Sequence, residues 1–110
     1  MAYDPDLADR MRKALDDRDG ISERKMFGGI CFMLNGNMLC GVESDRFTFR
    51  VGKDQEAMAV AKPGAGPMEF TGRPLGGFVW VDASACKGRA LAGWITLAER
   101  FVGALPAKGR

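Results

Sequence analysis

The chain has 110 residues, of which 46% are hydrophobic and 27% charged, so its size and composition fit one globular domain with a single core. Its 16 basic and 14 acidic residues give a net charge of only +2, which is too small to indicate nucleic-acid binding by itself. No apolar run approaches the ~20 residues that cross a bilayer, and the acidic start lacks a signal-peptide pattern. We therefore expect a cytoplasmic protein that does not engage a membrane.

The first predicted element is an amphipathic helix. Asp4 is a favourable N-cap residue, and Pro5 suits the first helical position. Gly20 is the expected C-cap. The residues between them that recur at spacings of three and four, as one apolar stripe, are Leu7, Met11, Ala14 and Leu15.

Residues 21–51 follow a strand pattern, which we interpret as three strands. Gly28 and Gly29 interrupt the first strand, as at a bulge or a close approach of two backbones. Asn35-Gly36 predicts a tight hairpin, because a type I′ turn needs positive φ at both central residues. A second turn is expected near Ser44-Asp45.

The hairpin turn fixes a predicted register and hence the two faces of the sheet. It places Met33 opposite Met38, Phe32 opposite Leu39 and Cys31 opposite Cys40, because side chains alternate with a period of two. The face predicted to form the core carries Cys31, Met33, Met38, Cys40, Val42, Phe47, Phe49 and Val51. The other face is half apolar, which is more than a solvated antiparallel sheet usually shows. Its centre, Phe32, Leu34 and Leu39, is therefore our candidate partner-binding surface, for a second copy of the chain or for another protein.

The second half of the chain adds two helices and two strands. We expect a short helix over residues 53–61, strands over 67–71 and 78–82, and a loop over 72–77 that joins these strands. The closing helix extends from Leu91 to Leu105 and ends before Pro106. The predicted order is α-β-β-β-α-β-β-α, which gives a two-layer α+β fold with an antiparallel sheet. We expect one domain over residues 1–110, ordered from about residue 3 to 106.

Several strings of the sequence, taken in order, resemble the TfoX N-terminal domain family, which is the N-terminal half of bacterial regulators of natural competence. The resemblance covers nearly the whole chain, and its most specific part is the Met-Phe-Gly-Gly string. The matching strings are Arg24-Lys25-Met26-Phe27-Gly28-Gly29, Asn35-Gly36-Asn37-Met38, Phe49-Arg50-Val51, Pro67-Met68-Glu69-Phe70-Thr71-Gly72-Arg73-Pro74 and the closing helix from Leu91 to Trp94.

This resemblance implies a compact α/β domain whose antiparallel sheet is flanked by helices. It also implies a regulatory role in full-length members, in which a separate C-terminal domain follows. The family contributes no established catalytic residues, so we expect a stand-alone regulatory domain that acts through protein–protein contacts.

The residue types available for chemistry are few. The chain has no histidine, which excludes Ser-His-Asp and Cys-His nucleophilic sites and histidine metal sites. We expect no enzyme activity, no cofactor and no metal. Cys31 and Cys40, if opposed on neighbouring strands, could form a redox-active disulfide, or both could be buried and reduced. Cys86, beside Lys87, is expected to be an ordinary surface thiol.

A basic patch is the remaining candidate site. Arg73 lies in the predicted loop, where its guanidinium could bind a carboxylate or phosphate or could instead brace the loop itself. Together with Arg24, Lys25 and Arg50, it could bind nucleic acid. The hypotheses are therefore a protein-interaction domain, a nucleic-acid-binding regulator and, last, a thiol redox protein.

Overall fold

A computed structural model of the chain describes residues 3–26, 28–70 and 73–106. Its strands form one antiparallel sheet of six strands in the order β1-β2-β3-β4-β6-β5. The elements, in chain order, are α1 (Pro5–Ala14), β1 (Ile21–Met26), β2 (Gly29–Leu34), β3 (Asn37–Glu43), β4 (Arg46–Arg50), α2 (Lys53–Val60), β5 (Ala65–Phe70), β6 (Arg73–Asp82), a 3-10 turn (Ala83–Ala85) and α3 (Arg89–Val102).

Helix α1 begins as its sequence predicts and ends earlier. The Asp4 carboxylate caps it by accepting a hydrogen bond of 2.9 Å from the Asp6 amide. Leu15, not Gly20, is the C-cap residue, and its own side chain is buried in the core. Gly20, with a φ of 82°, lies in the turn that leads into β1.

The first predicted strand is divided into two at the glycine pair. Gly28 has a φ of 76° and lies between β1 and β2, which pair with each other in an antiparallel hairpin. The chain therefore reverses where the sequence suggested only an interruption, and β1 becomes an edge strand of the sheet.

The hairpin between β2 and β3 has the predicted turn but a different register beyond it. Asn35 and Gly36 have φ values of 52° and 85°, as the type I′ turn requires, and Met33 pairs with Met38. The register then shifts, so that Phe32 pairs with Cys40 instead of Leu39. The shift is a β-bulge, in which two residues of one strand oppose one residue of the other.

The next hairpin keeps its predicted register. Val42 pairs with Phe47 and Cys40 with Phe49, as expected from the second turn. The bulge lies at Leu39, between the Met33–Met38 and Cys40–Phe49 pairs. It therefore exchanges the predicted faces of β2 and of Met38, but not those of β3 beyond Leu39 or of β4. The core side of the sheet consequently carries Ile30, Phe32, Leu34, Cys40, Val42, Phe47 and Phe49, and Leu39 joins the same core cluster.

The predicted loop over residues 72–77 is wrong. Strand β6 begins at Arg73 and continues to Asp82, while residues 71 and 72 lie outside the described part of the chain. Gly77 has a φ of 85°, yet its carbonyl accepts hydrogen bonds from the amides of Val51 (2.8 Å) and Gly52 (3.1 Å). These bonds fasten β6 to the segment that follows β4, so the glycines distort the strand without ending it.

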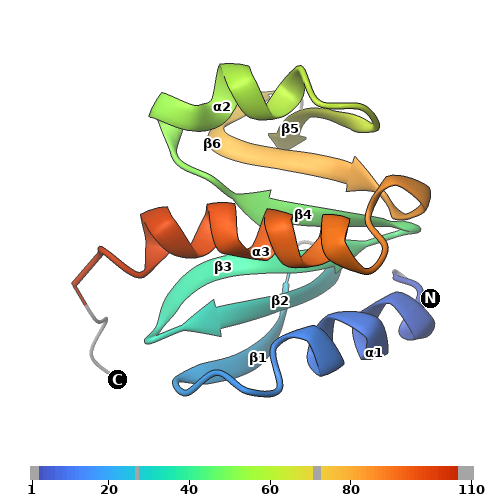
Figure 1. Ribbon diagram of the computed structural model, residues 1–110, viewed down its shortest axis with the longest axis vertical. Coiled ribbons are helices and arrows are strands. Elements are labelled where there is room, and N and C mark those ends of the chain that lie inside the picture. Colours follow the sequence, from blue (N-terminus) through green and yellow to red (C-terminus); the bar gives the residue numbers. More distant parts are fainter. Residues whose placement is uncertain (1–2, 27, 71–72, 107–110) are drawn as a thin grey trace.

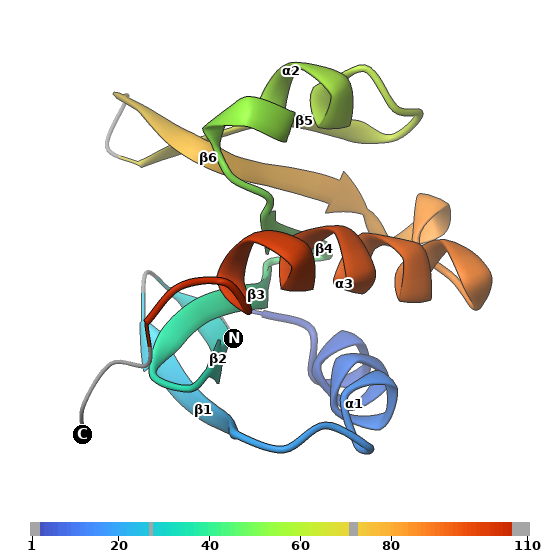
Figure 2. The ribbon, with the colours of Figure 1, turned by 60° about the vertical axis from the view of Figure 1, so that its left-hand side comes forward.

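The helices of the described residues all lie on one face of the sheet. Helix α3 crosses β3 and β4, and α1 lies beside it against β3 and near β1 (Figure 1). Helix α2 lies over β6 and β5, on the same face of the sheet as α3 (Figure 2). The Trp94 ring of α3 stacks on Phe49 of β4, with ring centroids 5.4 Å apart, and joins the helix layer to the sheet. The two-layer α+β fold is confirmed, and the predicted order of helices and strands holds with the first predicted strand divided into β1 and β2.

Candidate functional site

The partner-binding surface predicted from the sequence is part of the core. Phe32, Leu34 and Leu39 are only 1%, 8% and 0% exposed, and all three belong to the main hydrophobic cluster. The β-bulge is the physical reason, because it turns the predicted outer side of β2 toward the helices. These residues hold the fold together and offer no surface for a partner or a second copy.

The cysteines do not form the predicted cross-strand pair. Cys31 pairs with Gly41 across the hairpin, and Cys40 pairs with Phe32. All three cysteines are free and buried, so the prediction that Cys86 is a surface thiol is also wrong. Burial raises the pKa of Cys40 and raises that of Cys86 to about 12, which keeps both thiols protonated. The Cys40 thiol is 3.6 Å from the Met11 sulfur, in the role of an apolar filler.

The predicted basic patch is spread over the sheet. Arg24 and Lys25 are exposed on β1, at one edge, where their side chains alternate between the two faces. Arg50 lies at the end of β4, which is separated from β1 by β2 and β3. Arg73 begins β6, and its side chain lies outside the described residues. Nucleic-acid binding through this set stays a prediction.

A surface that sequence reasoning missed lies between α2 and α3. Two adjoining hollows, of about 660 and about 720 Å³, share Met58, Leu97 and Arg100 in their linings. The first extends to the start of α2 and the end of α3, and the second to the end of α2 and the start of α3. We call the surface lined by these two hollows the α2–α3 groove.

Helix α3 contributes a second stripe of residues to this groove. Its core stripe carries Leu91, Trp94, Ile95, Ala98 and Val102, and one edge of the buried Trp94 also reaches the groove. The groove stripe follows the same helical spacing, shifted by one residue along the helix. It includes Ala90, Gly93, Trp94, Leu97, Arg100 and Phe101, and Thr96 also lines the second hollow. A Cβ atom built on Gly93 meets no other atom within 4 Å, so the groove is open along this part of α3.

Helix α2 forms the opposite wall and lies against β6 and β5. It begins after Gly52, whose φ is 88°, and Ala59 is its buried side chain. The Glu56 carboxylate accepts a hydrogen bond of 2.9 Å from the Gly77 amide, which ties the helix to β6. Met58 points away from the core and is 50% exposed, the one exposed large hydrophobic side chain within the described ranges.

Four basic side chains surround the groove. The Arg50 guanidinium lies 5.6 Å from the centre of the Phe78 ring and 5.5 Å from that of Phe101, and Lys62 Nζ lies 5.9 Å from the Trp94 ring. Lys53 and Arg100 are exposed on the two walls. In the part of the chain that the structure describes, none of these four cations forms an ion pair. The groove lining contains one carboxylate, Asp54.

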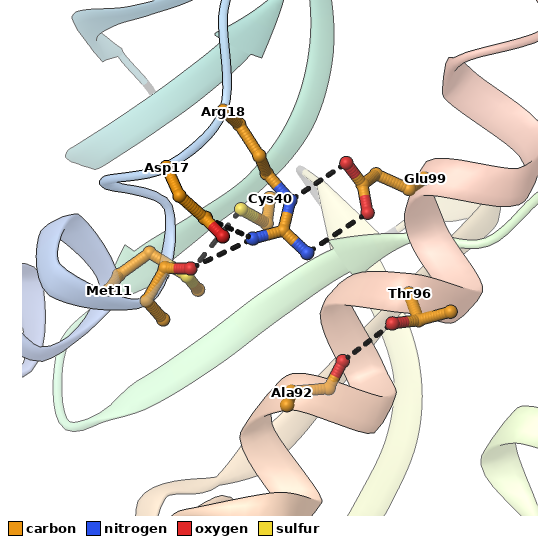
Figure 3. A network of polar contacts seen from close by, with 8 residues as sticks. Met11, Asp17, Arg18, Cys40, Ala92, Thr96 and Glu99 are labelled. Atoms are coloured by element: carbon orange, nitrogen blue, oxygen red, sulfur yellow. Dashed lines mark hydrogen bonds and ion pairs between the residues drawn. The ribbon is translucent and has the colours of Figure 1, made fainter.

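On the side of α3 that faces α1, the arginine is paired with a carboxylate. Arg18, which follows α1, forms a two-point contact with Glu99 of α3, with N–O distances of 2.7 and 3.1 Å (Figure 3). It also contacts Asp17 and donates a hydrogen bond to the Ala14 carbonyl. These contacts raise the pKa of Arg18, chiefly through its hydrogen bonds to Glu99.

Two properties of the described residues bear on function. No helix there has the length and apolar character needed to span a membrane. No group of three or more acidic or cysteine side chains among them is placed to hold a metal ion.

The chain is similar to a known protein family. The family model described as the TfoX N-terminal domain matches residues 13–102. No curated protein and no solved structure matches the chain. The matched range starts within α1 and ends with the last residue of α3, so it includes both walls of the groove.

Proposed function

The chain belongs to the TfoX N-terminal domain family, and from this premise we propose that it is a non-catalytic regulatory domain that binds a partner protein in the α2–α3 groove. The observation that carries the proposal is the position of Met58. This side chain is half exposed at the point where the two hollows meet, although methionine is usually buried. Methionine adapts its shape readily, which suits a side chain that packs against a bound protein.

The composition of the groove supports binding more than catalysis. Its lining includes Leu97, Phe78 and Phe101 beside Met58, with no histidine or cysteine. General acid–base or nucleophilic chemistry needs a nucleophile and a base within hydrogen-bond reach. Asp54, the single carboxylate of the lining, has no such partner there.

A substitution at the centre of the groove tests this function. Met58→Glu places a charge on the apolar surface, whereas Met58→Leu preserves a hydrophobic side chain of similar volume. Because Met58 is outside the core, both variants should unfold at nearly the same temperature as the original protein. We expect cross-linking and affinity capture from the native cell to recover the same partner with Met58→Leu and to lose it with Met58→Glu.

A matched control comes from the other flank. Lys13 is exposed on α1, away from the groove, and Lys13→Glu should leave capture unchanged. A partner that is retained by Met58→Glu, or lost equally with Lys13→Glu, would place the binding surface elsewhere and overturn the proposal.

A further inference from the structure

The distribution of charge describes the partner more closely. The groove is bordered by four of the 16 basic residues of the chain and by one of its 14 acidic residues, although the chain as a whole is nearly neutral. Interfaces of proteins are arranged so that a positive surface meets a negative one. A partner segment for this groove therefore carries acidic side chains.

The positions of the cations suit a long segment. Arg50 and Lys53 border the first hollow, Lys62 borders the second, and Arg100 borders both. The groove stripe of α3, over residues 90–101, rises along the helix by about 16 Å. Carboxylates distributed over roughly three helical turns would face a cation at each end and in the middle.

The walls of the groove select the conformation of the segment. Both walls are helices, whose backbone groups beyond the first turn already bond within the helix. The strand residues that line the first hollow, Arg50 and residues 76–78, belong to β4 and β6, each of which has a neighbouring strand on both sides. An extended peptide would leave its own amides and carbonyls without partners against this apolar surface. A helix satisfies its backbone internally and can place an apolar ridge against Met58 and Leu97.

We propose that the α2–α3 groove binds an acidic amphipathic α-helix of a partner protein. The apolar side of that helix packs between Met58 and Leu97, near the small residue Gly93, and its carboxylates face Arg100 and the lysines. This inference rests on the proposed docking function, and it adds the chemistry and the conformation of the partner.

The test uses a synthetic helix as the probe. A fluorescein-labelled peptide of about 14 residues, or roughly four helical turns, carries leucines at helical spacing on one side and glutamates on the other. Its match has every glutamate replaced by lysine. We expect fluorescence anisotropy to report binding of the acidic peptide, weakening as salt is added, and no binding of the basic peptide.

Charge-reversal variants locate the binding. Arg100→Glu and Lys62→Glu should each weaken binding of the acidic peptide about tenfold, and Lys13→Glu should change it by no more than about twofold. Gly93→Gln and Gly93→Glu introduce side chains of nearly equal size, so the extra loss with Gly93→Glu measures charge alone. Circular dichroism and thermal unfolding confirm that each variant is folded.

The outcomes separate the inference from the function on which it rests. Three results would overturn the inference. They are equal binding of the basic and acidic peptides, an equal loss of peptide binding with Lys13→Glu, and a single-stranded oligonucleotide that binds the protein more tightly than the acidic peptide and is lost with Arg100→Glu and Lys62→Glu. If a cellular partner depends on Met58 but the acidic peptide does not compete with it, the docking function stands and the acidic-helix inference is wrong. If capture is independent of Met58 and the acidic peptide does not bind, both are wrong.

Discussion

The two sides of helix α3 use their charged residues in opposite ways. Toward α1, Glu99 binds Arg18 at two points, and nearby Arg12 binds Glu23 at 2.7 and 2.9 Å. Toward α2, Arg100 forms no ion pair with any described residue, although it is the next residue along the helix. Beside α3, the arginines Arg12 and Arg18 on the α1 side are paired with carboxylates of the chain, whereas Arg100 on the α2 side is not paired with any described carboxylate.

The difference has a physical consequence for each side. A cation that is already bound to a carboxylate of its own chain contributes to stability and has little left to offer a ligand. A cation without such a carboxylate keeps its charge available to a ligand, even where, like Arg50 and Lys62, it lies over an aromatic ring. Arg10 is an exception on the α1 side, since its guanidinium lies 5.8 Å from the Phe47 ring and its buried Nη1 has no hydrogen-bond partner among the described residues.

Removing the ion pair between Arg18 and Glu99 should have the largest effect on stability. Glu99→Ala leaves the Arg18 guanidinium, which is 24% exposed, without its main acceptor. We expect the free energy of unfolding to fall by about 1.5–3 kcal/mol, the range for hydrogen bonds to charged groups. Urea unfolding of Glu99→Ala, Arg18→Ala and the double variant measures it. Losses that simply add would show that the two side chains are not coupled.

A substitution in the groove should increase stability instead of reducing it. Gly93 lies within α3, where glycine is unfavourable, and a Cβ atom there meets nothing within 4 Å. Gly93→Ala should therefore raise the free energy of unfolding by about 0.5–1 kcal/mol. Urea unfolding checks the gain. A loss of stability would mean that the groove is more tightly packed at Gly93 than the structure describes.

The pH dependence of stability should distinguish the two sides as well. The hydrogen bonds from Arg12 hold the pKa of Glu23 below its ordinary value of 4.5. Because the folded pKa is lowered, this contribution is present above the unfolded pKa and is lost as the pH falls through the folded pKa. Both side chains are about 40% exposed, so the loss in Glu23→Gln should be at most about 1 kcal/mol at neutral pH.

The same variant should lose part of its acid sensitivity. Thermal unfolding between neutral pH and acid should show the difference between Glu23→Gln and the original protein shrinking below pH 4.5. A constant difference across this range would assign the effect to packing and not to the ion pair.

The smallest effect on the free energy of unfolding is expected at Arg100, the residue next to Glu99. Arg100→Ala removes an exposed side chain that no described carboxylate binds, so the free energy of unfolding should change by no more than about 0.5 kcal/mol. The contrast with Glu99→Ala is measured in the same helix by the same urea titration. A comparable loss in both variants would erase the distinction between the two sides of α3.

Sequence signals that depend on neighbouring residues predicted much of the fold. Asp4-Pro5 and Asn35-Gly36 specify a helix start and a turn through their own backbone preferences, and both are confirmed. The bulge opposite Phe32 is a property of two strands together, and no single residue announces it. This one shift in register moved the predicted binding surface into the core.

The groove was missed for a related reason. Ala90, Gly93, Leu97 and Arg100 follow helical spacing and could have indicated a second stripe on α3. Helix α2, however, has no apolar stripe of its own, so nothing in its sequence indicates that it lies beside α3. The glycines at positions 76 and 77 also suggested a loop, which hid the long strand β6 that holds α2 in place.

The most direct test of the account is a titration of isotope-labelled protein with the acidic helical peptide, followed by the backbone amide signals in two-dimensional NMR spectra. Binding in the groove predicts shifts concentrated in residues 53–63 and 90–101, with the amides of residues 9–23 unchanged. Shifts concentrated in α1 and β1, or a spectrum that does not change at saturating peptide, would contradict the claim that the unpaired cations beside α2 bind an acidic helix.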